Sequence, residues 1–425
     1  MKACILTIGD EILLGQVVNS NAAWISQRLF TAGIEVVSQL VAGDTEKSIH
    51  QALKQAQAEV DLILLTGGLG PTEDDLTVAA FATFFNKKLV RDEEWIERMR
   101  AYFESRGRVM NALNEKQADR PEGAERIDND RGTAPGVWFE NEGKTYVIMP
   151  GVPYEMQAMM EISVLPKLAH APTARKYYQK NLFACGAGES VMAAKLVEKL
   201  SGKTPGHALD AKSVFHWPPE VKLAWLPNVT RVCLRLSAFE NAEKNAQQKM
   251  LEVESKIREV LGEYIFAETE GFDEITLEEA VGRILKEKKI TIATAESCTG
   301  GLLSAKLTDI AGSSSYVLGG VVAYDNKIKT LELDVPEMVL AAHGAVSEEV
   351  ATLMARNIRE IFSADIGVGI TGVAGPTGGT KEKPVGSVWI AISDGLTAKD
   401  RTIAKLYTFE KDRIRNRERA VQVAL

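Results

Sequence analysis

The stretch Thr294-Ala-Glu-Ser-Cys-Thr-Gly-Gly-Leu-Leu303 decides the fold of the last third of the chain. An apolar run precedes it at 290–293, and an apolar helical pattern begins at Leu302. Substrates of α/β proteins bind where a strand passes through a tight turn into a helix. Free backbone N–H groups and the positive end of the helix point into the crevice at that edge of the sheet. Ser297 and Cys298 in the turn indicate nucleophilic chemistry. The alternative is a glycine-containing turn with an incidental serine.

Length and composition limit the class of protein. A chain of 425 residues is long enough for two or three domains. A net charge of −8 and a pI near 5.5 argue against a dominant nucleic-acid partner. The sequence shows no signal peptide and no apolar run of membrane-spanning length. Four cysteines without metal-type spacing, at positions 4, 185, 233 and 298, fit reduced thiols. We therefore expect a cytoplasmic protein without a membrane partner.

The chain is expected to have three parts, at 1–170, 171–266 and 274–425. Strands and helices alternate in the first part, which predicts a parallel sheet with helices on both faces, and the alternation returns in the last part. Between them, two predicted strands (176–185 and 232–238) and two predicted helices suggest a small α+β module. The expected fold class is α/β, with two three-layer α/β/α domains flanking that module.

A glycine-rich loop follows a predicted strand in the first part, at Thr66-Gly-Gly-Leu-Gly-Pro-Thr-Glu-Asp-Asp75. Its three glycines allow the backbone to approach an anion closely and to present N–H groups to a phosphate. The loop matches neither the Walker pattern nor the dinucleotide-binding pattern. The candidate substrate-binding residues of this part are Gly67, Gly68, Gly70, Pro71 and Thr72.

Acidic residues stand at the ends of neighbouring predicted strands. A carboxylate pair would repel a bare phosphate, but it can hold a divalent cation that bridges to one. The candidate metal ligands are Asp10, Glu11, Asp44, Asp74 and Asp75. The alternative for each single residue is a role in forming a turn or a helix start.

Five motifs, at 9–15, 19–21, 66–75, 132–136 and 149–156, resemble the CinA family of competence/damage-inducible proteins. The resemblance covers essentially the whole chain. It implies a molybdopterin-binding-like first domain, associated in this family with metal-dependent ADP-ribose pyrophosphatase activity that uses magnesium or a similar ion. It also implies a KH-like middle module. That module lacks the Gly-x-x-Gly loop of RNA-binding KH domains, and 206–220 fits no pattern, so we expect a connecting or dimerisation role in a homodimer and no RNA binding.

The last part resembles nicotinamide mononucleotide (NMN) deamidase at 295–301, 324–329, 344–347 and 369–376. Amide hydrolysis needs a nucleophile, a proton acceptor and donors for the oxyanion. Since His343 is the only histidine in this part, a Ser–Lys pair is the expected substitute, because a desolvated lysine can have a lowered pKa. We assign Ser297 as nucleophile and Lys329 as base. Tyr324 would relay the proton or orient the substrate, and this site would need no metal.

The remaining residues of this predicted site would bind substrate: backbone N–H groups would hold the oxyanion, and a cation would bind the phosphate. They are Thr299, Gly300, Gly301, Asn326, Thr371, Gly372 and Arg413. Several alternatives stay open. Cys298 is a rival to Ser297 as the nucleophile. In the alternative interpretations of the other residues, Lys329 is a surface lysine, Tyr324 packs in the core and Arg413 belongs to a charged helix face. The mechanism requires the Ser297 hydroxyl and the Lys329 amine to meet at the carboxyl edge of the last sheet.

The predicted function is a bifunctional enzyme of pyridine-nucleotide recycling that acts on NMN and on ADP-ribose. A second hypothesis is that the first domain binds a nucleotide or molybdopterin without turnover. A third, a DNA-uptake or repair accessory, is suggested by the family's name, but the sequence shows no basic stripe or aromatic platform for it.

Overall fold

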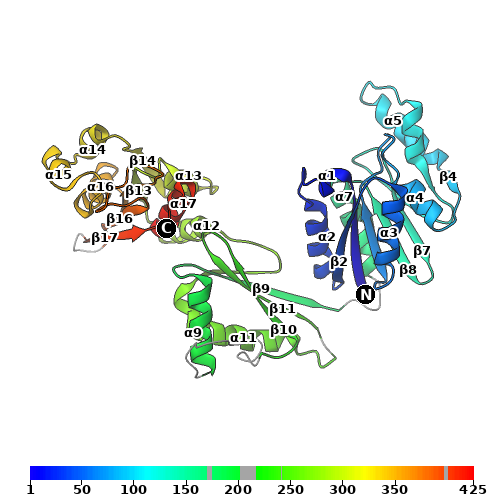
Figure 1. Cartoon of the computed structure of the whole chain (residues 1–425), viewed down its shortest axis with the longest axis horizontal. Helices are drawn as coiled ribbons and strands as arrows, with labels where there is room; N and C mark the ends of the chain where they lie inside the picture. The colour runs from blue at the N-terminus through cyan, green and yellow to red at the C-terminus, as the bar shows by residue number, and fades with distance from the viewer. Residues whose placement is uncertain (170–174, 202–216, 241, 397–400) are drawn as a thin grey trace. The chain divides into compact units, whose positions relative to one another are not determined.

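The computed structural model describes residues 1–169, 175–201, 217–240, 242–396 and 401–425 (Figure 1). The chain divides into two compact units, one made of 1–178 with 238–247 and the other of 179–237 with 248–425. Within the described ranges, no helix combines the length and the apolar character needed to cross a bilayer.

The first unit contains a six-stranded sheet in the order β2-β1-β3-β8-β7-β6. Its strands are β1 (Lys2–Ile8), β2 (Glu35–Ala42), β3 (Leu62–Thr66), β6 (Glu125–Ile127), β7 (Gly136–Asn141) and β8 (Lys144–Met149). Strands β2, β1, β3 and β8 are parallel, as expected. The expectation of a wholly parallel sheet is wrong for β7 and β6. The physical reason is the two-residue turn Glu142-Gly143, where φ angles of 50° and 77° join β7 to β8 in a tight hairpin.

Helices cover both faces of this sheet (Figure 1). One face packs against α3 (Glu46–Ala56) and α4 (Thr77–Phe84), and the other packs against α2 (Ser20–Thr31) and α7 (Pro153–Met159). Alternate residues of β1, β3, β7 and β8 enter the two cores, which confirms the three-layer prediction. Outside these layers lie α1 (Asp10–Leu13), β4 (Leu89–Arg91), α5 (Glu93–Glu104), α6 (Ala112–Glu115) and β5 (Asp119–Pro121).

The middle part forms a four-stranded sheet in the order β10-β11-β9-β12. Its elements are β9 (Tyr177–Ala184), α9 (Glu189–Ser201), β10 (Val221–Pro227), β11 (Val232–Phe239), α11 (Ala246–Leu261) and β12 (Ile265–Glu270). The expectation of two strands is therefore too low. Strands β10 and β12 lie at the two edges of the sheet and are largely half-buried or exposed, so their hydrophobic alternation in the sequence is weak. Most of the unassigned segment 206–220 lies outside the described residues.

The C-terminal part forms a five-stranded sheet in the order β14-β13-β15-β16-β17. The strands are β13 (Ile292–Glu296), β14 (Val317–Val322), β15 (Ile366–Gly372), β16 (Ser387–Asp394) and β17 (Arg401–Thr408). Strand β13 pairs in parallel with both neighbours, whereas β16 and β17 run antiparallel. The eight-residue edge strand β17 was not expected. Its exposed and half-buried residues alternate without a strongly apolar face.

Helices on both faces complete the second three-layer arrangement. Helices α12 (Leu277–Lys288), α13 (Leu302–Thr308) and α17 (Arg413–Ala424) pack on one face. Helices α14 (Asn326–Leu333) and α16 (Glu348–Ile361) pack on the other, with α15 (Glu337–His343) between them in the chain. The helices that follow β13 and β14 thus lie on opposite faces. The carboxyl edge between two such strands is where α/β sheets form ligand crevices.

Candidate active site

The end of β13 sets the geometry of the nucleophile turn. Glu296, the last residue of β13, is fully buried, and its carboxylate accepts hydrogen bonds from the Leu303 N–H (3.0 Å) and the Ser304 N–H (2.8 Å) at the start of α13. The next residue, Ser297, donates its N–H to the Ile370 carbonyl of β15 at 2.9 Å. Ser297 is 8% exposed. The turn is therefore fixed both to the neighbouring strand and to the following helix.

Lys329 of α14 contacts the Ser297 side chain. The Lys329 Nζ lies 3.2 Å from the Ser297 Oγ, 2.8 Å from the Ala323 carbonyl oxygen and 3.5 Å from the Tyr324 carbonyl oxygen. Lys329 is 1% exposed, which excludes the interpretation as a surface lysine. The expected meeting of the hydroxyl and the amine at the carboxyl edge of the sheet is thus present.

Burial also prepares Lys329 for proton transfer. Burial lowers the pKa of the Lys329 amine, and the nearby Asp325 carboxylate opposes part of that effect. In its neutral form the amine can donate two hydrogen bonds to the carbonyls of Ala323 and Tyr324. Its lone pair is then available to accept the proton of the Ser297 hydroxyl, whose oxygen lies 3.2 Å away. A nucleophile, a base and groups that orient the base form the arrangement that activated serines require.

Cys298, the rival nucleophile, points into the core on the other side of the turn. It packs with Leu303 and Leu307 of α13 and is 6% exposed. Burial raises the pKa of its thiol to about 12. The thiol is therefore protonated near neutral pH, and this environment disfavours the thiolate that a cysteine nucleophile needs.

Two glycines shape the rest of the turn. Gly300 and Gly301 have φ angles of 62° and 88°, in the left-handed region that favours glycine. The Gly300 N–H donates to the Ser297 carbonyl at 3.0 Å. Of the N–H groups expected near Thr299–Gly301 as oxyanion donors, that of Gly300 is thus occupied, and Glu296 occupies the N–H groups of Leu303 and Ser304 further along the helix start. The buried hydroxyl of Thr299 has no hydrogen-bond partner among the described residues.

Tyr324 and Arg413 lie together at the edge of this site. Tyr324 is 60% exposed, so it does not pack in the core. Its hydroxyl accepts a hydrogen bond from the Arg413 Nη2 at 2.8 Å, and the Arg413 Nη1 donates to the Gly375 carbonyl at 2.8 Å. The exposed Arg413 therefore connects a second glycine-containing turn to the segment that carries Lys329.

The other predicted binding residues have different surroundings. Thr371 is buried, and its hydroxyl donates to the Ala345 carbonyl at 2.7 Å. A Cβ at Gly372 would lie 2.7 Å from the Ser387 carbonyl oxygen, so tight strand packing explains this glycine. Asn326 is exposed at the first position of α14. Of the three residues Thr371, Gly372 and Asn326, Asn326 is therefore the one whose side chain is exposed.

Three residues near the turn were missed in the sequence. Glu296 anchors α13, as described above. Arg417 donates from Nε (3.0 Å) and Nη2 (2.8 Å) to the Thr299 carbonyl, and the buried Asn416 donates to the Ala374 carbonyl at 3.1 Å. The signal for Arg417 was its position four residues after Arg413, because residues four apart share one face of a helix.

The glycine-rich loop of the first domain packs against the end of β1. A Cβ at Gly67 (φ 111°) would lie 2.1 Å from the Ile8 carbonyl oxygen. The Asp75 carboxylate accepts bonds from the Thr72 N–H (2.9 Å) and hydroxyl (2.5 Å), and Lys116 donates to the Thr72 carbonyl. Asp75 therefore closes a turn, as the alternative interpretation states. A cavity of about 180 Å³ lies beside the loop, and its lining includes Gly68, Gly70, Asp75, Lys116 and Gln117 but neither Pro71 nor Thr72.

Two of the predicted metal ligands are brought together. The Asp10 N–H donates to the Asp44 carboxylate at 2.8 Å, and the Asp44 N–H donates to the Asp10 carboxylate at 3.3 Å. Burial raises the pKa of Asp44, and the charges of Asp10, Glu11 and Asp74 raise it further. Within the described part of the chain, no three His, Cys, Asp or Glu side chains are placed to hold one metal ion. The acidic edge is present, but the residues that the structure describes do not preassemble a complete set of metal ligands.

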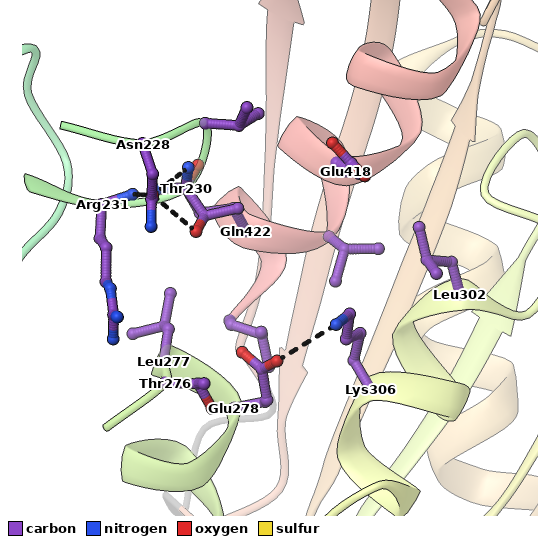
Figure 2. Close-up of a pocket in the computed structure, with 13 residues that line it drawn as sticks. Asn228, Thr230, Arg231, Thr276, Leu277, Glu278, Leu302, Lys306, Glu418 and Gln422 are labelled. Atoms are coloured by element: carbon purple, nitrogen blue, oxygen red, sulfur yellow. Dashed lines mark hydrogen bonds and ion pairs between the residues drawn. The ribbon is translucent and has the colours of Figure 1, made fainter. Parts of the chain in front are cut away.

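A larger cavity, of about 370 Å³, lies in the second unit (Figure 2). It is lined by the turn at 228–231, the start of α12 and the outer sides of α13 and α17. Lys306 of α13 forms an ion pair with Glu278 of α12 across it at 3.5 Å. Ser297, Lys329 and Arg413 are not among its lining residues. This cavity is therefore separate from the serine–lysine pair.

The separate sheets and their covering helices define a multidomain α/β protein, and its C-terminal part carries a buried serine–lysine pair. Family models match in three segments: the probable molybdopterin binding domain at 4–170, the CinA KH domain at 179–267 and the CinA C-terminal domain at 274–425. The CinA-like protein of Salinibacter ruber is 41% identical over 426 residues, covering 100% of this chain and 98% of the relative. That of Cytophaga hutchinsonii is 42% identical over 395 residues, covering 92% and 90%. The chain belongs to the CinA family.

Solved structures of family members also match parts of the chain. The CinA protein of Thermoplasma acidophilum, whose function is described as unknown, is 36% identical, with a TM-score of 0.37 over 40% of this chain and 97% of that one. A competence/damage-inducible protein of Agrobacterium tumefaciens is 36% identical, with a TM-score of 0.34 over 35% and 88%.

Proposed function

We propose that the C-terminal domain hydrolyses the carboxamide of NMN to a carboxylate, giving nicotinate mononucleotide and ammonia. The observation that carries this proposal is the 3.2 Å contact between the Ser297 hydroxyl and the buried Lys329 amine. This pair supplies a nucleophile and a base without a histidine or a metal. The choice of NMN as the amide comes from the resemblance to NMN deamidases.

The reaction would proceed through an acyl-enzyme. Lys329 takes the proton of the Ser297 hydroxyl as the oxygen attacks the carboxamide carbon, and it returns that proton to the nitrogen that leaves as ammonia. A water molecule then attacks the ester with Lys329 again as base, which releases the carboxylate and restores the serine. Arg413, which is exposed beside Tyr324, is the cation that would bind the phosphate of NMN.

Product analysis tests this proposal. Wild type and Ser297→Ala are incubated with NMN, with and without a divalent metal, and ammonia and nicotinate mononucleotide are measured. Wild type should form both products in either condition, and Ser297→Ala should form neither. Equal ammonia release by the two proteins would exclude Ser297 as the nucleophile.

We also propose that the N-terminal domain is a metal-dependent ADP-ribose pyrophosphatase. The glycine-rich loop, the adjacent cavity and the paired carboxylates of Asp10 and Asp44 support it. Phosphate oxygens of the substrate would complete the coordination of a magnesium-like ion, which would neutralise charge and activate water. Ser297→Ala should retain this activity. Binding of ADP-ribose without cleavage in the presence of metal would favour a binding module for a nucleotide or molybdopterin.

We propose that the protein is located in the cytoplasm and forms a homodimer. All four cysteines are free, which supports a location in a reducing cytoplasm. We retain the proposal of a homodimer formed through the KH-like module. Sedimentation of the full chain tests it.

A further inference from the structure

One planar peptide links Arg417 to the backbone of the nucleophile. The Thr299 carbonyl accepts both hydrogen bonds of the Arg417 guanidinium, at 3.0 and 2.8 Å. The N–H of the same peptide group belongs to Gly300 and donates to the Ser297 carbonyl at 3.0 Å. Because a trans peptide holds its C=O and N–H antiparallel, fixing the carbonyl with Arg417 also aims the N–H at Ser297.

This peptide needs an external anchor. Gly300 and Gly301 have the least restricted backbones of all residue types, so the turn that they form is not held by its own sterics. A guanidinium that donates two charge-assisted bonds to one carbonyl supplies a strong and directional restraint. Thr299 is fully buried, so water does not compete for this carbonyl from the Thr299 side.

The same helix also holds the second turn of the site. Asn416 donates to the Ala374 carbonyl at 3.1 Å, and Arg413 donates to the Gly375 carbonyl at 2.8 Å. The first five residues of α17 thus contact both the turn that carries Ser297 and the turn at 374–375. Asn416 itself is anchored by a bond to the Glu410 carbonyl at 2.8 Å.

We propose that Arg417 is a positioning residue that sets the aim of the Ser297 hydroxyl through the Thr299–Gly300 peptide. The proposal rests on the proposed role of Ser297 as a nucleophile. Arg417 does not touch the reacting atoms in this assignment. It acts on the rate of the chemical step, and substrate binding by Arg413 and Asn326 is left in place.

Two measurements on the full chain test the proposal. The first is the rate at which a fluorophosphonate probe labels Ser297, a reaction that forms a P–O bond and expels fluoride while the hydroxyl proton passes to Lys329. The second is steady-state deamidation of NMN, with kcat and KM determined separately. The variants are Arg417→Met and Arg417→Lys. Arg283→Met is the control, because Arg283 is an exposed residue of α12 that pairs with Glu279.

Arg417→Met should lower both the labelling rate and kcat on the order of 10²-fold, the loss expected for a misplacement of about 1 Å, with KM nearly unchanged. In Arg417→Lys the labelling rate and kcat should fall less, because lysine keeps the positive charge but cannot donate two parallel hydrogen bonds to the carbonyl. Arg283→Met should match wild type. If Arg417→Met fails to fold, as judged by its thermal melt, the same two rates of Arg417→Lys decide the question.

The outcomes separate this inference from the proposed function. Labelling and kcat at the wild-type level in a folded Arg417→Met protein would overturn the positioning role, while wild-type turnover of NMN would leave the deamidase proposal intact. Loss of labelling in Arg417→Met together with no NMN turnover by wild type would support the positioning role and remove NMN as the substrate.

Discussion

Replacing Lys329 with methionine removes the proposed base and little else. Methionine fills most of the same volume, so packing under α14 is largely preserved. Proton transfer by a positioned base contributes about 10²–10⁴-fold to a rate, so kcat/KM should fall by at least about 10²-fold, or roughly 2.7 kcal/mol. The carbonyls of Ala323 and Tyr324 lose a donor, which costs about 1–3 kcal/mol, while the cost of burying an amine disappears. Stability should therefore change much less than activity.

The lowered pKa of Lys329 predicts the direction in which activity and stability change with pH. Burial lowers the pKa of Lys329 below the ordinary lysine value of about 10.4. Wild-type kcat/KM should rise with pH as the amine loses its proton, with a midpoint below that value. Between the two pKa values the unfolded chain holds a proton that the folded chain lacks, so the free energy of unfolding should also rise with pH there. Below the lowered pKa the amine is protonated in both the folded and the unfolded chain, and the folded chain bears the full cost of burying the charged amine.

The assay is ammonia release from NMN across pH 6–10, accompanied by urea unfolding of the same proteins. Lys327→Met is the matched control, because Lys327 is exposed on the same helix two residues away. Lys327→Met should keep the wild-type profile, whereas Lys329→Met should lose the rising limb. A Lys329→Met protein with activity within about tenfold of wild type, or with the same rising limb, would refute the assignment of Lys329 as base.

Three further predictions concern the nucleophile, the phosphate and the metal. Ser297→Ala should abolish deamidation, whereas Cys298→Ala should retain most of it because the buried thiol, with a pKa of about 12, supplies no thiolate; the reverse pattern would make Cys298 the nucleophile. Arg413→Ala should raise KM for NMN far more than for a dephosphorylated analogue, and equal losses for both would count against phosphate binding. A chelator should stop ADP-ribose cleavage and spare deamidation, since the serine–lysine pair needs no metal. Deamidation that collapsed with the chelator would instead favour a metal-activated water.

Some of the fold was readable because its signals are local. The strand–turn–helix order around Ser297 and the alternation of strands and helices in both terminal domains were predicted, and both three-layer domains are present. The antiparallel direction of β6, β7 and β16 was not expected. The hydrophobic pattern of a buried strand is the same in either direction, so its pairing direction depends on the turn before or after it. The edge strands β10, β12 and β17 were missed because only strands with a well-buried face show a strong period.

The sequence by itself determined the chemical groups of the candidate site: a serine and a cysteine in one turn, a distant lysine, and a basic final helix. It did not determine which of the first two faces the lysine. Tertiary structure decided that, by placing Lys329, 32 residues further along the chain, against Ser297 while the thiol of Cys298 enters the core beneath α13. It also brought Arg417 to Thr299 across 118 residues. Such contacts depend on which strands are neighbours and which face each helix covers, and a local hydrophobic period reports neither.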